Sequence, residues 1–286
     1  MKISLTLSSK IYIWSIFFSL FVSSLLSPPA PRVLVTGGMY AASTFPKLIL
    51  HTYLVNYLTF NLSSFFFISA ATGYIGRNVV RELISRNIPT IAVVRSNDLS
   101  PFTASYLKGA NIVVGNVQNE KEIGTIVEEF LPTVSICCLA SRSGIKRDSW
   151  DIDYLGGLNV LNAFSQHSKT TCPHFVLLSA FCVGKPRLQF QKAKLKLEAA
   201  IRANDRVSHS IVRPTAFFKS IDGQIESVRK GTPVLYFGDG SCSANAICAG
   251  DLAKFMCDCA LDSSLLMNST LAVGGPGFTI FLRFFF

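Results

Sequence analysis

The sequence predicts an α/β protein built on a doubly wound parallel sheet, and three observations favour this fold class. Short apolar runs alternate with amphipathic stretches along most of the chain, as in repeated strand–helix–strand units. A glycine-rich turn joins an early strand to a helix. The length of 286 residues is enough for one such domain together with a smaller lobe that holds a substrate.

The glycine-rich turn emerges when two separated segments are joined. Residues 32–37 (R-V-L-V-T-G) form an apolar strand, and residues 71–76 (A-T-G-Y-I-G) open an amphipathic stretch. Together they give G-x-x-G-x-x-G, with Gly37, Gly73 and Gly76 as its glycines. Glycines permit the tight turn and the close approach of a pyrophosphate to a helix N-terminus. This predicts a dinucleotide site of the Rossmann type, and the alternative is an ordinary glycine turn.

The 33 residues from Gly38 to Ala70 fit no part of such a turn. Within them, residues 48–68 are long and apolar enough for a transmembrane helix. A membrane span, however, would place the two halves of the turn on opposite sides of a bilayer, and a loop of this length is rare inside a compact domain. We therefore favour a retained intron, because its first and last codons can contain splice signals and its removal keeps the reading frame.

The helix after the turn and the next strand complete the first unit. Ile75, Val79 and Leu83 fall on one helical face, and residues 90–95 (T-I-A-V-V-R) form the second strand. Arg95 ends that strand, where an enzyme that uses NAD would usually carry an acidic residue. A guanidinium suits the 2′-phosphate of NADPH, so we expect NADPH over NADH. A solvated arginine is the alternative.

The alternation continues along the chain. We expect strands at residues 111–114, 133–140, 174–180 and 208–213, with helices at 119–130, 150–167 and 187–203. In a parallel sheet of this kind, ligands collect at the carboxyl ends of the strands. The expected cofactor-binding residues are therefore Gly37, Thr72, Gly73, Tyr74, Ile75, Gly76, Arg95, Ala140, Ser141, Ser179 and Pro214.

The net charge and the N-terminal residues indicate which binding partners and which cellular compartment to expect. The net charge of +10 has no cluster like a nucleic-acid-binding stripe, so we expect no nucleic acid. Residues 1–31 resemble a secretory leader, because Lys2 and Lys10 precede an apolar run that ends in P-P-A-P. A single-pass anchor is the alternative.

The cysteines restrict the cellular compartments in which we expect the protein. The spacings of the eight cysteines match no zinc site, so no metal is expected and core thiols are the better interpretation. Reduced cysteines behind a signal-like leader fit ordinary secretion poorly. A plastid reached through the secretory route reconciles the two and leaves an association with a plastid membrane open.

Residues near the fifth strand carry a resemblance to the extended or atypical short-chain dehydrogenase/reductases. Those enzymes have Ser or Thr at the end of the fifth strand and a Y-x-x-x-K pair on the next helix. Ser179 matches the first, and F-Q-K-A-K places Lys194 at the lysine but Phe190 at the tyrosine. The usual acid is missing, which would cripple a dehydrogenase that interconverts hydroxyl and carbonyl groups.

Longer stretches resemble one subfamily, the divinyl chlorophyllide 8-vinyl reductases. The matching stretches are residues 137–154, 174–186, 190–198, 210–220 and 237–240. The resemblance implies reduction of the 8-vinyl group of divinyl chlorophyllide or protochlorophyllide a to ethyl, with NADPH, in plastids. A non-catalytic NADP-binding assembly or regulatory factor for photosynthetic complexes stays open as a second hypothesis. A reductase of another conjugated substrate is a third.

The resemblance also implies residue roles and domain limits. Lys194 would hold the nicotinamide ribose, unless it is a surface lysine of a basic helix, and Tyr154 is an alternative proton donor. Phe181, Phe190, Phe217 and Phe218 would line an apolar pocket or belong to the core. We expect a leader at 1–31, the NAD(P)-binding domain with its substrate lobe at 32–277, interrupted at 38–70, and an aberrant tail at 278–286 that leaves the lobe incomplete.

Overall fold

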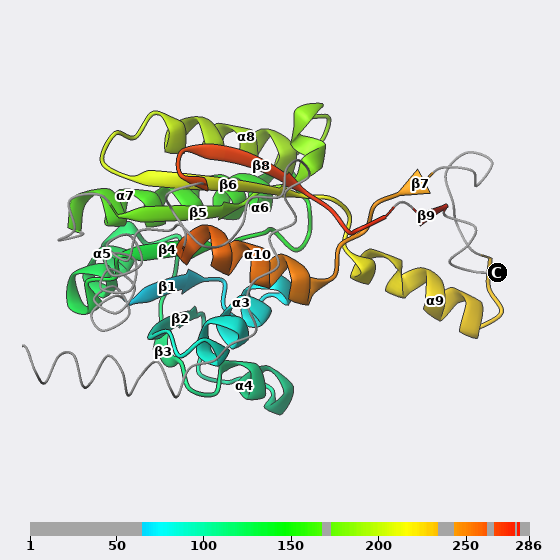
Figure 1. The fold of residues 1–286 in the computed structure, drawn as a ribbon, viewed down its shortest axis with the longest axis horizontal. Coiled ribbons are helices and arrows are strands. Elements are labelled where there is room, and N and C mark those ends of the chain that lie inside the picture. Colours follow the sequence, from blue (N-terminus) through cyan, green and yellow to red (C-terminus); the bar gives the residue numbers. More distant parts are fainter. Residues whose placement is uncertain (1–64, 168–172, 234–242, 262–265, 278, 281–286) are drawn as a thin grey trace, which may run out of the picture. The chain divides into compact units, whose positions relative to one another are not determined.

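The computed structural model describes residues 65–167, 173–233, 243–261, 266–277 and 279–280, all within one compact unit. Among these residues, the centre is a seven-stranded parallel sheet with the order β3-β2-β1-β4-β5-β6-β8 (Figure 1). The strands are β1 (Phe66–Ser69), β2 (Thr90–Val94), β3 (Asn111–Val114), β4 (Val134–Cys137), β5 (His174–Leu178), β6 (Ser208–Pro214) and β8 (Ser269–Val273). The chain runs outward from β1 in one direction and then from β4 in the other, so the predicted doubly wound sheet is confirmed.

Helices cover both faces of this sheet. One face carries α3 (Tyr74–Ser85), α4 (Pro101–Leu107) and α10 (Ala249–Leu261), and the other carries α5 (Glu120–Phe130), α7 (Gly157–His167) and α8 (Gln189–Arg202). Shorter elements are α6 (Lys146–Asp148), the π-helical η1 (Ser149–Gly156), η2 (Phe181–Gly184), η3 (Phe218–Ile221), α9 (Asp222–Arg229) and the antiparallel pair β7 (Ser243–Ala244) and β9 (Thr279–Ile280). Two separate apolar cores therefore flank the sheet.

The first strand differs from the prediction. We expected it at residues 32–37, which lie outside the described residues, but the strand that enters the glycine turn is Phe66–Ser69, inside the predicted insertion. Phe66 and Ile68 face one core and Phe67 faces the other, all with 0% exposure. Burying each such side chain stabilises by about 1.5–3 kcal/mol. The apolar run that lies nearest to the turn in the sequence therefore forms this strand, although the joined motif favours the earlier run.

Most other predicted elements are confirmed within two residues of their expected limits. The fourth strand is shorter than residues 133–140, and the helix expected at 150–167 begins as the π-helical η1 before it continues as α7. A π-helix turns its side chains away from α-helical positions, and such segments are frequent at functional sites. We did not predict α10 and β8, which complete one core and one edge of the sheet.

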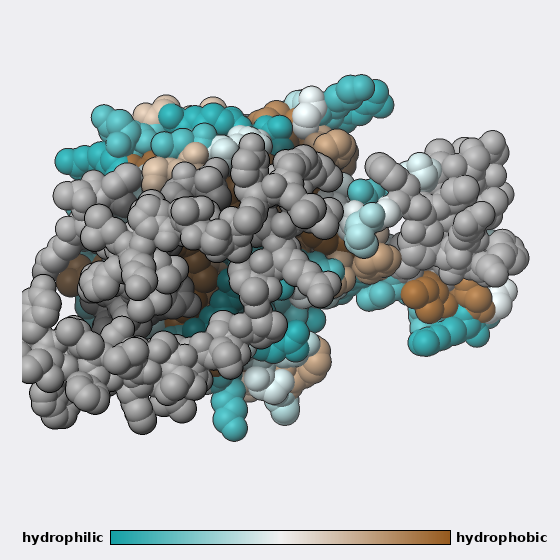
Figure 2. All heavy atoms as spheres, viewed as in Figure 1, coloured by the Kyte–Doolittle hydropathy of each residue, from teal (hydrophilic) through white to brown (hydrophobic). Residues whose placement is uncertain are grey.

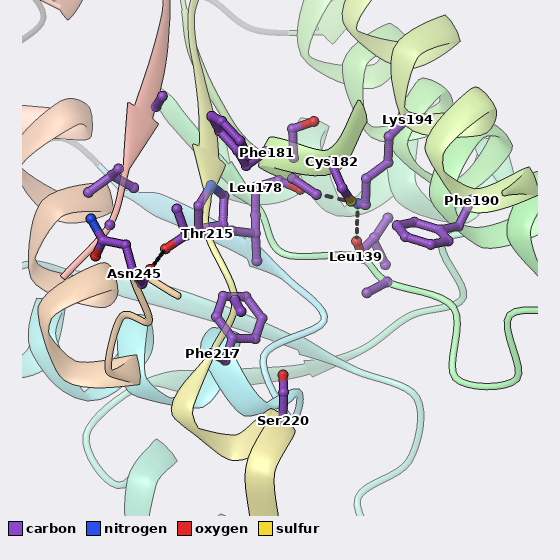
Figure 3. Close-up of a pocket in the computed structure, with 18 of the residues that line it drawn as sticks. Leu139, Leu178, Phe181, Cys182, Phe190, Lys194, Thr215, Phe217, Ser220 and Asn245 are labelled. Atoms are coloured by element: carbon purple, nitrogen blue, oxygen red, sulfur yellow. Dashed lines mark hydrogen bonds between the residues drawn. The ribbon is translucent and has the colours of Figure 1, made fainter. Parts of the chain in front are cut away.

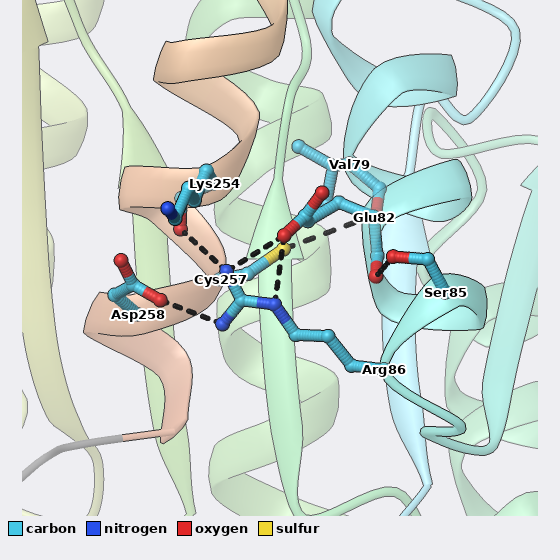
Figure 4. Close-up of polar contacts among 7 residues, drawn as sticks. All are labelled: Val79, Glu82, Ser85, Arg86, Lys254, Cys257 and Asp258. Carbon is cyan, nitrogen blue, oxygen red and sulfur yellow. Dashed lines mark hydrogen bonds and ion pairs between the residues drawn. The ribbon is translucent and has the colours of Figure 1, made fainter. Parts of the chain in front are cut away.

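A polar contact and apolar packing join α3 to α10 (Figure 4). The Arg86 guanidinium donates to Glu82 Oε1 at 2.8 Å and to Asp258 Oδ1 at 2.6 Å. Asp258 is 47% exposed, so this pair contributes at most about 1 kcal/mol. The two helices are held mainly by their buried residues, such as Leu83 and Met256.

Exposed apolar side chains gather on α9, as Figure 2 shows. Ile225 and Val228 are 38% and 49% exposed there. Within the part of the chain that the structure describes, no helix is both long and apolar enough to cross a membrane. The predicted leader and most of the predicted tail lie outside the described residues.

Candidate functional site

The turn between β1 and α3 has the geometry that the fingerprint predicts. The backbone N–H of Gly73 donates to the carbonyl of Ala70 at 2.9 Å. A Cβ atom on Gly76 would lie 2.2 Å from the same carbonyl oxygen, and one on Gly73 would lie 3.1 Å from it. Gly76 is therefore required sterically, because the start of the helix passes so close to the turn.

The N-terminus of α3 is open to an anion. Gly73 precedes the helix and offers no side-chain cap, and the first turn contains no acidic residue. Thr72, Gly73 and Tyr74 are partly exposed, whereas Ile75 is buried in the core. Uncapped N–H groups and the helix dipole favour a phosphate group at this point. The start of α3 therefore fits the pyrophosphate of a dinucleotide.

One predicted glycine is replaced in this turn. Gly37 lies outside the described residues, and Ala70 takes the place before Ala71 that the joined motif gives to Gly37. Ala70 has a φ of +57°, in the left-handed region that glycine tolerates best. The turn in this structure thus meets the conformational demand with an alanine, and the assignment of Gly37 to the turn stays a prediction.

Arg95 lies at the carboxyl end of β2, beside the strand that enters the turn, and its side chain is exposed. Its charge acts on one nearby acid. Hydrogen bonds from Ser143 lower the pKa of Asp148, and Arg95 adds a smaller lowering effect. The guanidinium is thus accessible at the edge where the ribose of a dinucleotide would lie.

Lys194 is buried rather than exposed. Its Nζ atom donates to the carbonyls of Leu139 at 3.0 Å and Leu178 at 3.1 Å, which follow β4 and end β5. Asp153 Oδ1 lies 3.2 Å away and completes an ion pair between side chains that are 6% and 1% exposed. The alternative of a surface lysine is therefore wrong, and the π-helical η1 supplies the counter-ion.

Ser141 belongs to the same group of residues. Its backbone N–H donates to Asp153 Oδ2 at 3.3 Å. Asp153 therefore joins the loop after β4 to the lysine of α8. The neighbouring Ala140 is exposed.

Ser179 meets a second buried carboxylate. Its hydroxyl donates to Glu198 Oε1 at 2.6 Å, and Glu198 has no exposed surface. Arg213 donates to both carboxylate oxygens, and Arg202 donates to Oε2 at 2.8 Å. Sequence reasoning missed Glu198, although an acid four residues after Lys194 on the same helix was a usable signal.

Ser179 and Lys194 line a cavity of about 850 Å³, called the main cavity from here on and shown in Figure 3. Lys194 extends from α8 to the Leu139 carbonyl, and the Phe190 ring lies beside it. Ala140, Ser179 and Pro214 also line the cavity, as do Phe181, Phe217 and Asn245. The wall is mainly apolar, which suits a flat conjugated ligand. The structure thus brings together four of the predicted cofactor-binding residues, namely Ala140, Ser179, Lys194 and Pro214, with three of the predicted pocket phenylalanines, Phe181, Phe190 and Phe217.

A second cavity of about 970 Å³ shares Phe181, Cys182 and Ala272 with the first. Lys185 and Arg187 line it and are exposed. The apolar cavity therefore adjoins a cavity that is lined by basic side chains.

Tyr154 is not among the described residues that line either cavity. Its ring packs edge-on against Trp150, and the Lys196 ammonium lies 4.6 Å from its centre. Lys196 is exposed on a different side of α8 from the buried Lys194. The role of Tyr154 as a proton donor therefore stays a prediction without support from this geometry.

Comparison with known proteins is consistent with this arrangement. The sequence model of the NAD(P)H-binding family matches residues 70–263. The chain is 44% identical over 221 residues to a protein of Arabidopsis thaliana named divinyl chlorophyllide a 8-vinyl-reductase, chloroplastic, covering 72% of this chain and 52% of that protein. A Zea mays protein of the same name is 40% identical over 270 residues, covering 90% of this chain and 62% of the relative. The chain spans about half the length of the curated relatives it matches.

Solved structures share the fold. The UDP-glucose 4-epimerase of Thermotoga maritima, determined with UDP-glucose, has a TM-score of 0.64 at 16% identity, covering 77% of this chain and 80% of that one. At this identity the likeness concerns the fold alone.

Proposed function

The chain belongs to the NAD(P)H-binding family, and from this premise we propose that it uses NADPH to reduce the 8-vinyl group of divinyl chlorophyllide or protochlorophyllide a to ethyl. The relatives with that activity in their names support the substrate, at 40–44% identity over 72–90% of this chain. Their names also place them in the chloroplast, so we propose a plastid location for this chain.

The observation that carries the proposal is the pairing of Phe190 with Lys194 at one apolar cavity. The two residues lie one turn apart on α8, so they share a face. A phenylalanine cannot move the proton that an alcohol or ketone requires. A phenylalanine ring can instead pack against a flat macrocycle. The reduction of a vinyl group on that macrocycle needs no proton transfer at an oxygen atom.

When bound, NADPH supplies a hydride to the vinyl carbon that is conjugated with the macrocycle. The residues of this chain orient the reactants. Lys194 keeps a positive charge at the carboxyl ends of β4 and β5, held by two carbonyls and Asp153. Such fixed charge costs no reorganisation when charge spreads into the pigment. Because Tyr154 does not line the cavity, our proposal takes the final proton from water.

We propose NADPH over NADH because Arg95 is exposed at the end of β2, where its guanidinium can pair with a 2′-phosphate. We also propose that the second cavity receives the carboxylate of the pigment. Lys185 and Arg187 line that space, and both are free of partners among the ion pairs of the described residues. The pigment would thus lie across both cavities.

We further propose that residues 38–70 come from a retained intron, of which Phe66–Ser69 form β1 in this structure. The positive φ of Ala70 supports this, because the joined sequence would place Gly37 at that position. The limits of the leader, the lobe and the tail stay predictions.

Anaerobic turnover tests the proposed function. The full chain is incubated with NADPH and divinyl protochlorophyllide, and the pigments are separated by chromatography. We expect a monovinyl product that requires NADPH and the folded protein. Cofactor binding without turnover would favour an assembly or regulatory factor, and turnover of only another conjugated substrate would favour the third hypothesis.

A further inference from the structure

The hydroxyl of Ser179 has a fixed hydrogen-bonding direction. Ser179 follows β5, is 4% exposed and lines the main cavity. Its Oγ atom donates to Glu198 Oε1 at 2.6 Å, a short distance typical of a hydroxyl bound to a charged acceptor. Ser179 therefore lines the cavity, while its hydroxyl is bound to a carboxylate that is not part of the cavity wall.

Glu198 can only accept hydrogen bonds in this setting. Burial raises the pKa of Glu198, but hydrogen bonds from Arg213, Ser179 and Arg202 outweigh that effect and hold the pKa below its ordinary value. Arg213 donates from Nε at 3.0 Å and from Nη2 at 2.5 Å, in the paired arrangement of a guanidinium with a carboxylate. The carboxylate is thus ionised and fully surrounded by donors.

This arrangement determines what Ser179 can offer a ligand. A hydroxyl has one hydrogen to donate and two lone pairs to accept with. Because Glu198 takes the hydrogen, only the lone pairs remain for a ligand in the cavity. Ser179 therefore cannot stabilise a carbonyl or alkoxide oxygen, which needs a donor.

We propose that Glu198 is a positioning residue that makes Ser179 a hydrogen-bond acceptor, that Ser179 accepts from the carboxamide N–H of the nicotinamide, and that this polarity disfavours carbonyl substrates. The cofactor part rests on membership of the NAD(P)H-binding family, and the substrate part rests on the proposed function. Phe190 supports the same selection, since it too has no proton to give at the cavity.

Calorimetric binding to the full chain tests the cofactor part. NADP⁺ is compared with its 3-acetylpyridine analogue, in which a methyl group replaces the carboxamide nitrogen and cannot donate. We expect the parent to prefer NADP⁺ by about five- to tenfold, as one hydrogen bond is worth roughly that much. Ser179→Ala should abolish this preference, and Ser179→Thr, which keeps the hydroxyl, should retain it.

Two further variants separate positioning from folding. Ser85→Ala removes an exposed hydroxyl at the end of α3 and should leave the preference unchanged. Glu198→Gln should weaken the preference, because an amide oxygen accepts the Ser179 hydrogen less strongly than a carboxylate and the amide NH2 group can instead donate to the Ser179 hydroxyl. If Glu198→Gln does not fold, the Ser179 pair still decides the outcome.

The results distinguish this proposal from the proposed function. A preference that survives in Ser179→Ala overturns the acceptor role, and so does a parent chain that binds no NADP⁺. A preference that depends on Ser179, in a chain that does not reduce the pigment, supports the acceptor role while the proposed function fails.

Discussion

The Nζ atom of Lys194 lies 3.2 Å from Oδ1 of Asp153, and both side chains are almost fully buried. The pair joins α8 to the π-helical η1, and the lysine also holds the ends of β4 and β5 together through two carbonyls. A buried charge is tolerated only with such partners. The site and the fold therefore depend on the same ammonium group.

Replacing this lysine should remove most of the activity. We expect Lys194→Ala to lower vinyl reduction by about 10²-fold, because the proposed contact with the nicotinamide ribose is lost and the hydride is misplaced. Lys192→Ala is the matched control, since Lys192 is exposed on the same helix and should keep the parental rate. Steady-state turnover of divinyl protochlorophyllide measures both, and a parental rate in Lys194→Ala would show that the lysine serves structure alone.

Loss of folding must be excluded for that variant. Removing one partner of a buried ion pair costs about 3–5 kcal/mol, because Asp153 is left charged and unpaired. The double variant Lys194→Met with Asp153→Asn removes both charges, so it should be more stable than Lys194→Ala while it stays inactive. Phe190→Tyr should not create alcohol dehydrogenase activity, since Ser179 has no hydrogen to donate to an alkoxide.

The charge at the end of β2 should set the choice of cofactor. We expect Arg95→Asp to weaken NADPH binding by about 1.5–3 kcal/mol, the range for a hydrogen bond to a charged group, and to change NADH binding far less. Calorimetric titration with each cofactor measures this. Arg229→Asp, at an exposed position on α9, should leave both affinities unchanged. An unaltered ratio of the two affinities in Arg95→Asp would rule out a contact with the 2′-phosphate.

The alanine in the nucleotide turn should be a source of strain. Because Ala70 has a φ of +57°, we expect Ala70→Gly to raise the free energy of unfolding by about 1 kcal/mol. Excising residues 38–70 puts Gly37 at the same position and should also strengthen NADPH binding. Urea denaturation and calorimetry measure the two effects.

The matched control for that turn is Gly76→Ala. Its new Cβ would lie 2.2 Å from the Ala70 carbonyl oxygen, so this variant should lose stability. Equal NADPH affinity with and without residues 38–70 would contradict the insertion hypothesis.

A buried histidine should make stability depend on pH. Burial lowers the pKa of His174 to about 4, with a smaller contribution from His209, and its ring nitrogens lie 2.8 and 3.0 Å from the hydroxyls of Ser208 and Ser210. The unfolded chain binds the proton near pH 6.5. The stability that results from the pKa shift of His174 is therefore fully present above about pH 6.5, and this contribution is lost as the pH falls toward 4.

Denaturation at two pH values measures this contribution. Between pH 7.5 and pH 5, His174 should account for a loss of about 2 kcal/mol in the free energy of unfolding. His174→Asn cannot titrate, so it should lose less stability over the same interval than the parent does. Equal losses in the two proteins would assign the pH dependence to other groups.

The sequence predicted those elements whose apolar runs have no competitor. Residues 90–94 and 174–178 are short apolar runs between polar segments, so only one placement buries them. The first strand was misplaced because two apolar runs precede the turn, and only proximity to Gly73 distinguishes them. The π-helical start of the helix at residue 149 was not predicted either. The spacing of apolar residues in the sequence does not show whether one helical turn holds an extra residue.

The site was predictable where one motif holds the residues together. Gly73, Gly76 and Lys194 follow from local patterns, and the structure places the two glycines in the turn and the lysine at the main cavity. The contacts of Asp153 with Lys194 and of Glu198 with Arg213 did not follow, because they depend on how separate elements pack. Sequence spacing does not reveal such contacts.

The central claim is that a hydride from a nicotinamide nucleotide enters the 8-vinyl group. It is tested most directly by incubating the full chain with divinyl protochlorophyllide and NADPH that carries deuterium at both C4 positions, followed by mass spectrometry of the pigment. We predict a monovinyl product with one deuterium in its ethyl group. A reduced pigment without deuterium, or a pigment that keeps its vinyl group while the cofactor is bound, would contradict the account.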